Sequence, residues 1–130
     1  MALELYNSLS RTRETFTPAH DDEVRVYACG PTIYARAHIG NFRSFVVYDL
    51  FHRWLAWKGW TPRFVVNLTD VDDKTIRNAK EAGVSLREFT SRFADAFLAD
   101  LDTLGFRPFS AMPRATDHVE QMVAWIERLE

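Results

Sequence analysis

Apolar side chains recur at helical spacing through the middle of the chain. After Gly40 no Gly or Pro interrupts the chain up to Trp57, and the stretch 39–57 predicts one helix that ends before Gly59. The apolar positions expected on its core face are Phe42, Val46, Leu50, Trp54 and Trp57. A second helix is predicted over Asp72–Ala82, because Gly83 can adopt the left-handed conformation that closes a helix.

A third helix has the clearest signals at both ends. Ser85 and Glu88 have the spacing of a capping box, and Gly105 follows the last apolar position. Its expected core face consists of Leu86, Phe89, Phe93, Phe97, Leu101 and Leu104. After Pro108 and Pro113 a last amphipathic helix is predicted to start near Thr116.

The last helix is expected to run straight into Glu130. Its apolar positions are Val119, Met122, Val123, Ile126 and Leu129. No Gly or polar tail follows them, so the pattern favours a chain that stops inside an element.

Two short stretches are typical of buried strands. Val24–Ala28 alternates apolar and mixed residues, and Phe64–Leu68 is β-rich and suits a strand covered on both faces. Near the N-terminus, Leu3–Leu9 and Glu14–Thr17 could form a hairpin before Pro18 ends the pairing.

Strands and helices therefore alternate along the chain. This order predicts an α/β fold in which two parallel strands are joined by a right-handed crossover with flanking helices. Ligands of such sheets bind beyond the carboxyl ends of the strands. Those ends lie at Cys29–Gly30 and at Leu68–Asp70, so we expect binding residues in these two loops.

Composition adds limits to this picture. With 47% hydrophobic residues and a formal net charge of −2, the 130 residues suit one globular unit and not a polycation that coats nucleic acid. The longest apolar run, Met122–Ile126, is far shorter than the roughly 20 residues of a membrane-spanning helix. The single cysteine, Cys29, excludes an intrachain disulfide, and together with the absence of a secretory signal it favours the cytoplasm.

The start of the first long helix is the best candidate for an anion site. His38-Ile-Gly-Asn41 lies where free backbone N–H groups and the positive end of the helix dipole would stabilise a polyphosphate. Gly40 would let a flat ligand approach the backbone. The chain contains neither G-x-x-x-x-G-K-[ST] nor G-x-G-x-x-G, which excludes those two phosphate-binding loops.

Taken residue by residue, these positions also have simpler interpretations. His38 could be an ordinary histidine at a helix start, and Cys29 could be a buried small hydrophobe. Thr69 could cap the following helix as well as line a pocket. The carboxylates of Asp70, Asp72 and Asp73 are interpreted as complements to the helix dipole in preference to a metal cluster.

Four sequence motifs, taken together, favour functional roles for these residues over the simpler interpretations. They are Cys29-Gly-Pro-Thr-Ile-Tyr34, His38-Ile-Gly-Asn41, Asn67-Leu-Thr-Asp-Val-Asp-Asp-Lys74 and Pro113-Arg-Ala-Thr-Asp-His118. In this order and spacing they closely resemble the N-terminal catalytic half of the cysteinyl-tRNA synthetases. The resemblance runs from about Leu5 to the end of the chain. It implies that residues 1–130 are the N-terminal half of a Rossmann-like nucleotide-binding domain of the class I synthetase (HUP) type, with the remainder of the enzyme absent from this chain.

The resemblance also implies an activity and its partners. A class I synthetase joins cysteine to ATP, with Mg²⁺, to form cysteinyl-adenylate and then transfers the cysteine to tRNA(Cys). A cytoplasmic enzyme without membrane association, and a monomer, are expected. The flexible lysine loop that completes the ATP site of this family does not occur here, so the isolated chain is expected to be inactive.

Site residues follow by position in the matching motifs. The resemblance implies that His38 and Asn41 are catalytic and bind ATP together with Thr32 and Gly40, with Gly40 against the adenine. Asn41 stands where the signature often has histidine; it can still donate a hydrogen bond but cannot carry a charge.

The cysteine substrate is expected at the neighbouring loop. The resemblance implies that Cys29, Gly30 and Thr69 bind it, and that Cys29 is one ligand of a catalytic Zn²⁺ whose other ligands lie downstream. Thiolate binds zinc far better than a hydroxyl does, which would separate cysteine from serine.

Two alternatives remain open at this stage. One is the related cysteine ligase of mycothiol biosynthesis, which tends to place proline after the threonine where this chain has Ile33. The other is a truncated paralogue that binds nucleotide or tRNA without catalysis.

Overall fold

The computed structural model describes residues 2–20 and 22–129 and begins with a hairpin. Strands β1 (Glu4–Asn7) and β2 (Thr12–Thr15) pair antiparallel, with Glu4 opposite Thr15. The hairpin predicted from the sequence is confirmed, but its first strand is shorter than the expected Leu3–Leu9 and its second begins and ends two residues before the expected Glu14–Thr17.

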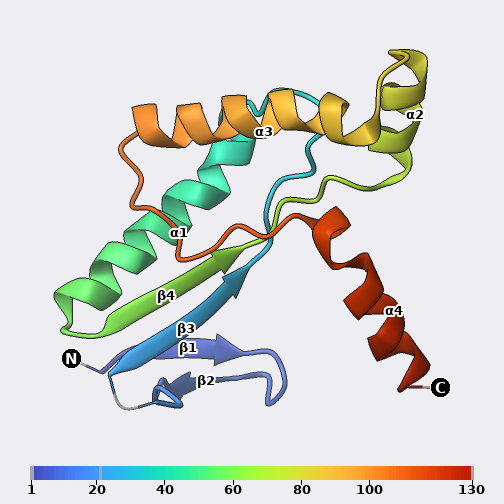
Figure 1. Cartoon of the computed structure of the whole chain (residues 1–130). Coiled ribbons are helices and arrows are strands. Elements are labelled where there is room, and N and C mark those ends of the chain that lie inside the picture. Colours follow the sequence, from blue (N-terminus) through green and yellow to red (C-terminus); the bar gives the residue numbers. More distant parts are fainter. Residues whose placement is uncertain (1, 21, 130) are drawn as a thin grey trace.

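The centre of the fold is a parallel pair of strands (Figure 1). Strand β3 (Glu23–Ala28) pairs with β4 (Thr61–Val66), and helix α1 (Ile39–Trp57) connects them. Ala28 lies opposite Val66, so both strands end at the same edge. This confirms the α/β class and the bounds of the long helix, whereas β4 begins and ends earlier than its β-rich run predicts.

A third extended segment, which the sequence did not reveal, borders β4 on its other side. Val66 N–H donates to the carbonyl of Ala111 at 3.1 Å, and Leu68 N–H donates to that of Pro113 at 2.8 Å. Two parallel bridges, Val65 to Ala111 and Leu68 to Arg114, accompany these bonds. The sequence did not predict this strand-like segment because Pro108 and Pro113 lie in or next to it. Proline disfavours strand formation in general, although an edge position tolerates it.

Two further helices connect β4 to that segment. Helices α2 (Asp73–Glu81) and α3 (Leu86–Thr103) are close to their predicted bounds, and Gly83 between them has the predicted positive φ of 67°. Ser85 caps α3 by accepting a hydrogen bond from the Glu88 N–H at 3.2 Å. The start and stop signals in the sequence therefore locate both helices.

The core lies between the sheet, α1 and α3. Phe97 of α3 stacks on Phe42 of α1 with ring centroids 5.5 Å apart and meets Phe45 edge-on at 5.0 Å. Phe64 of β4 is fully buried with Leu55 in a neighbouring cluster. Aromatic packing thus fixes α1 against both the sheet and α3.

The predicted core faces of the helices are partly wrong. On α1 the buried residues are Phe42, Phe45, His52 and Leu55, while Val46, Leu50 and Trp57 are exposed. On α3, Phe89, Phe97 and Leu101 are buried as predicted, whereas Leu104 caps the end of the helix and is exposed. The helical spacing was recognised correctly, but α1 carries apolar residues on two sides, and periodicity alone does not say which side packs.

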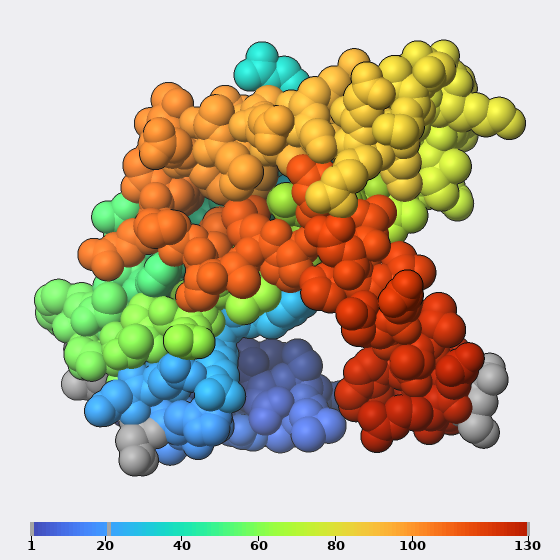
Figure 2. Space-filling model, in the orientation of Figure 1, coloured from blue at the N-terminus to red at the C-terminus, as the bar shows by residue number. Residues whose placement is uncertain are grey.

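The last helix stands apart from the rest of the molecule. A 3₁₀ turn, η1 (Ala115–His118), leads into α4 (Val119–Glu127), so the predicted amphipathic helix is present. Figure 2 shows open space between α4 and the hairpin. Within the described part of the chain none of the α4 side chains is buried. Glu130, to which this helix was expected to run, lies outside the described residues.

Helix length and hydropathy show whether any helix could span a membrane. Among residues 2–20 and 22–129, no helix is both long enough and apolar enough to cross a bilayer.

One core position is polar. His52 stacks on Phe64 with ring centroids 5.0 Å apart, and its Nδ1 atom is buried without a partner among the described residues. Burial lowers the pKa of the His52 imidazole, the positive charge of Arg107 lowers it further, and the Asp49 carboxylate acts in the opposite direction. Folding therefore favours the neutral form of this ring.

We expect the free energy of unfolding to fall as the pH drops below about 6.5, since the unfolded chain then binds a proton that folded His52 resists. His52→Phe keeps the aromatic packing and removes both the titration and the unpartnered nitrogen. It should stabilise the chain by about 1 kcal/mol near neutral pH, and the gain should grow as the pH falls.

Urea unfolding of both proteins at about pH 7.5 and about pH 5 measures this difference. His20→Gln, at an exposed histidine, is the matched control. An identical pH dependence in His52→Phe and the parent chain would contradict the assignment.

Candidate active site

The two strand-end loops lie side by side. Parallel pairing continues beyond β3 and β4: Thr69 N–H donates to the Pro31 carbonyl at 3.0 Å, and Ile33 N–H donates to the Thr69 carbonyl at 2.9 Å. Thr32 and Thr69 form a parallel bridge between them. The prediction that the loops after the two strands meet is confirmed.

Gly30 makes this approach possible. A Cβ atom at position 30 would lie 1.5 Å from the backbone oxygen of Asn67, a distance that no side chain can occupy. The Gly30 N–H also donates to Asn67 Oδ1 at 3.0 Å. Glycine is therefore required here for close backbone packing between the loops.

Asn67 is a site residue that sequence reasoning missed. Its Oδ1 accepts from Gly30, and its Nδ2 donates to Thr69 Oγ1 at 2.9 Å. One amide thus ties the backbone of one loop to the side chain of the other. A polar residue between the buried Val66 and Leu68 was the signal that could have found it.

The simpler interpretation of Thr69 as a helix cap is wrong. The residue that caps α2 is Asp72, whose Oδ1 accepts from the Thr75 N–H at 2.7 Å. The Thr75 hydroxyl in turn accepts from the Asp72 N–H at 2.7 Å. Thr69 is therefore left with its roles in the loop pairing.

His38 and Asn41 cap helix α1 reciprocally. His38 Nδ1 accepts a hydrogen bond from the Gly40 N–H at 3.0 Å, and Asn41 Oδ1 accepts one from the His38 N–H at 2.9 Å. Both side chains are exposed. The histidine at the helix start is thus a true N-cap, and Asn41 completes a capping box.

These caps determine which atoms remain free. A ring nitrogen that accepts a hydrogen bond carries no proton, so the neutral His38 imidazole has its proton on Nε2. Asn41 uses its oxygen in the cap, which leaves its NH₂ group to donate. Two side-chain donors therefore stand at the positive end of the α1 dipole, an arrangement suited to an anion.

Gly40 has a local role beside these donors. A Cβ at position 40 would lie 2.8 Å from His38 Cε1, so the imidazole occupies the space that any larger residue would need. Glycine here allows the ring to cap the helix.

A pocket brings three of the ATP candidates together. Its lining includes Thr32, His38 and Asn41, with Phe93 and Phe97 of α3. Cys29, Gly30 and Thr69 are not part of this lining, but Thr69 is bridged to Thr32 at its edge. The ATP candidates and the cysteine candidates therefore form two adjacent groups.

Cys29 is exposed and its thiol is free, so its interpretation as a buried small hydrophobe is wrong. Its Sγ lies 3.7 Å from the Gly30 carbonyl oxygen, a weak contact at most. Within the described residues no three His, Cys, Asp or Glu side chains come together as a metal site. The thiol is accessible to a metal ion, and this part of the chain offers one such ligand.

The three aspartates after β4 have different roles. Asp72 caps α2 and Asp73 lies in its first turn, as the dipole interpretation predicts. For Asp70 that interpretation is wrong, because its carboxylate is fully buried and faces η1.

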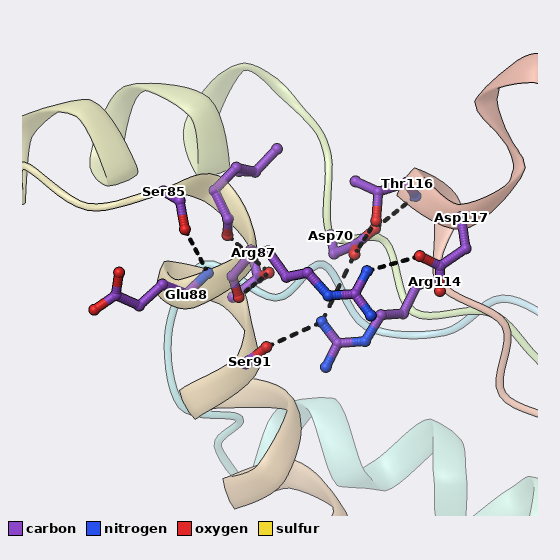
Figure 3. Close-up of polar contacts among 10 residues, drawn as sticks. Asp70, Ser85, Arg87, Glu88, Ser91, Arg114, Thr116 and Asp117 are labelled. Carbon is purple, nitrogen blue, oxygen red and sulfur yellow. Dashed lines mark hydrogen bonds and ion pairs between the residues drawn. The ribbon is translucent and has the colours of Figure 1, made fainter.

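Asp70 fastens the third extended segment to the end of β4 (Figure 3). Its Oδ1 accepts from the Thr116 N–H at 2.9 Å, its Oδ2 accepts from the Thr116 hydroxyl at 2.7 Å, and the Arg114 guanidinium lies 3.8 Å away. Next to it, Arg87 of α3 donates to Asp117 at 2.7 Å and lowers the pKa of that carboxyl. The buried charge is thus paired and hydrogen-bonded, as burial requires.

Comparison with known proteins places these loops in context. The family described as "tRNA synthetases class I (C) catalytic domain" matches residues 15–130. "Cysteine--tRNA ligase" of Koribacter versatilis is 48% identical over 130 residues, which is the whole of this chain and 26% of that protein. The proteins of the same name from Methanosarcina mazei and Pyrococcus horikoshii are 46% and 41% identical, over 98% and 100% of this chain and 27% of each relative. The chain spans about a quarter of the length of these relatives.

We expect Gly30→Ala to destabilise the chain by more than about 3 kcal/mol, because the added methyl group must force the two strand-end loops apart. Gly83→Ala is the matched control, since it has open space and only the strain of its positive φ, which costs about 1 kcal/mol. Urea unfolding measures both. Equal losses in the two variants would show that the close approach at Gly30 does not constrain the fold.

Proposed function

Because this chain belongs to the class I cysteine tRNA synthetase catalytic-domain family, we propose that it forms the part of a cysteine–tRNA ligase that binds the ATP phosphates and the substrate cysteine. The observation that carries the proposal is the capping box at the start of α1. It leaves two donors, His38 Nε2–H and the Asn41 NH₂ group, beside one pocket. Identity of 40–48% along the chain to proteins named cysteine–tRNA ligase supports it.

The proposed reaction needs charge stabilisation more than a protein nucleophile. A carboxylate oxygen of cysteine forms a bond to the α-phosphorus of ATP, the bond from that phosphorus to the bridging oxygen breaks, and pyrophosphate leaves. Negative charge accumulates on the phosphate oxygens in the transition state. His38, Asn41 and the N-terminus of α1 donate to those oxygens and are held in place beforehand by the cap. In the second step a ribose hydroxyl at the tRNA 3′ end attacks the carbonyl carbon and AMP leaves.

Thr32 and Gly40 complete the proposed ATP side of the site. Thr32 lines the same pocket as His38 and Asn41. Gly40 is proposed to lie against the adenine, and its lack of a Cβ also leaves the space that the His38 ring occupies. Mg²⁺ would accompany ATP as part of the substrate.

Cysteine is proposed to bind at the neighbouring loop through Cys29, Gly30 and Thr69. The exposed, free thiol of Cys29 fits the role of one zinc ligand, with the other ligands outside the described residues. Zinc bound there would attract the substrate thiolate and so favour cysteine over serine. The pairing of Gly30 and Thr69 through Asn67 would hold this loop at a fixed distance from the ATP pocket.

The names of the relatives favour transfer to tRNA over the amino-sugar transfer of mycothiol biosynthesis. We further propose a cytoplasmic, monomeric enzyme with tRNA(Cys) as the final acceptor. Activity is proposed for the complete ligase, since the chain corresponds to about a quarter of the relatives.

The test uses a chimaera in which this chain replaces the matching segment of the Koribacter versatilis ligase. His38→Asn keeps a side chain that can cap α1 but removes the Nε2–H donor on the other side of the ring. Asn41→Asp keeps the oxygen that accepts in the cap but replaces the NH₂ donor with a carboxylate oxygen. Each should lower kcat for cysteine-dependent exchange of pyrophosphate into ATP by about 10²-fold with little loss of stability.

Ser85→Asn, which changes the cap of α3 away from the pocket, is the matched control and should leave exchange unchanged. If both site variants exchange at the parental rate, the proposed role of the capping box in catalysis is wrong.

A second experiment addresses metal binding. Cys29→Ser in the chimaera should lower the zinc content measured by elemental analysis and weaken the preference for cysteine over serine, because the hydroxyl is a poor zinc ligand. Zinc content equal to that of the parent would rule out Cys29 as a ligand.

A further inference from the structure

Asn67 occupies a fixed position between the two strand-end loops. Its neighbours Val66 and Leu68 are buried, and their N–H groups donate to the carbonyls of Ala111 and Pro113 at 3.1 and 2.8 Å. The backbone at Asn67 is therefore held on both sides, while its half-buried amide contacts both loops. An amide held in this way can orient the groups that it contacts.

The orientation of this amide follows from the chemistry of its first partner. A backbone N–H can only donate a hydrogen bond, so the atom that faces the Gly30 N–H at 3.0 Å must be the Asn67 oxygen. The NH₂ group then faces Thr69 Oγ1 at 2.9 Å, and an NH₂ group only donates. The amide therefore makes the Thr69 oxygen an acceptor on this side.

This arrangement leaves the proton of the Thr69 hydroxyl without a use inside the loops. A hydroxyl carries one proton, and that proton cannot point at the NH₂ group that donates to its oxygen. Within the described residues the Asn67 amide is the one hydrogen-bond partner of this hydroxyl. The backbone groups of Thr69 are already paired with Pro31 and Ile33. The hydroxyl proton is therefore the part of Thr69 that remains to meet a ligand.

We propose that Asn67 is a positioning residue for cysteine recognition, and that it makes Thr69 Oγ1–H a donor to a negatively charged atom of the substrate. Cysteine offers two such acceptors, its carboxylate and its thiolate, whereas its ammonium group only donates. The inference rests on the proposed function, because that function places cysteine at Cys29, Gly30 and Thr69. It adds that a residue without contact to the substrate sets the polarity of the group that touches it.

Asn67→Asp reverses this polarity with almost no change in shape. One carboxylate oxygen still accepts from the Gly30 N–H, but the other accepts the Thr69 proton and withdraws it from the substrate. In the chimaera described above, this variant should raise KM for cysteine in pyrophosphate exchange by about tenfold, roughly the contribution of one hydrogen bond. KM for ATP should stay within about twofold, a separation that a general loss of structure would not give. Asn78→Asp, the same change on α2, is the matched control and should leave both constants unchanged.

A double-mutant cycle separates action through Thr69 from a direct effect of the new charge. Thr69→Val keeps the shape of the side chain and removes the hydroxyl, so it should raise KM for cysteine by a similar factor. Asn67→Asp should then add less than about twofold in the Thr69→Val background, because both changes remove the same proton from the substrate. Effects that multiply in the double variant would show that Asn67 acts independently and would overturn the proposal.

The analogue β-mercaptopropionate, which has the thiol and carboxylate of cysteine but no ammonium group, tests the nature of the acceptor. As a competitive inhibitor of exchange, it should lose affinity in Thr69→Val by about the same factor as cysteine. An unchanged inhibition constant would place the ammonium group at Thr69 and overturn the donor assignment.

The parent chimaera distinguishes failure of this inference from failure of the proposed function. An unchanged KM for cysteine in Asn67→Asp, in a chimaera that catalyses exchange, would overturn the inference alone. A parent chimaera without cysteine-dependent exchange would overturn the proposed function, and the inference with it.

Discussion

The architecture depends on parallel pairing that continues past the ends of β3 and β4. The two loops come so close at Gly30 that any side chain there would collide with the Asn67 carbonyl. Backbone bonds from Thr69 and Ile33 then hold the loops in register. This contact sets the separation between the candidate cysteine residues and the start of α1, so the geometry of the whole site follows from the absence of one Cβ atom.

A buried carboxylate extends the same arrangement across the sheet. Asp70, one residue beyond Thr69, binds both the backbone and the hydroxyl of Thr116, and it pairs with Arg114. These bonds fix the strand-like segment that follows α3 against the far edge of β4. An unpaired charge at full burial would be strongly unfavourable, so the partners of Asp70 specify where that segment must lie.

Helix α1 combines two requirements that act at different places along it. Its first turn is capped by His38 and Asn41 in a way that leaves donors free for an anion. Further along, its inner side packs on Phe64 and Phe97, while its outer side remains apolar and exposed. The residues that serve the site and the residues that serve packing therefore share a helix without competing for the same positions.

Much of this was determined by the sequence alone. Caps, glycines and apolar spacing located α1, α2 and α3, because these signals act within a few residues of the chain, and the motif blocks identified the family. The tertiary structure decided what depends on distant partners: the paired segment before Arg114, the link through Asn67, the burial of Asp70 and the exposure of Cys29. It also decided which side of α1 packs, since a helix that is apolar on two sides has no preferred face until the sheet and α3 provide one.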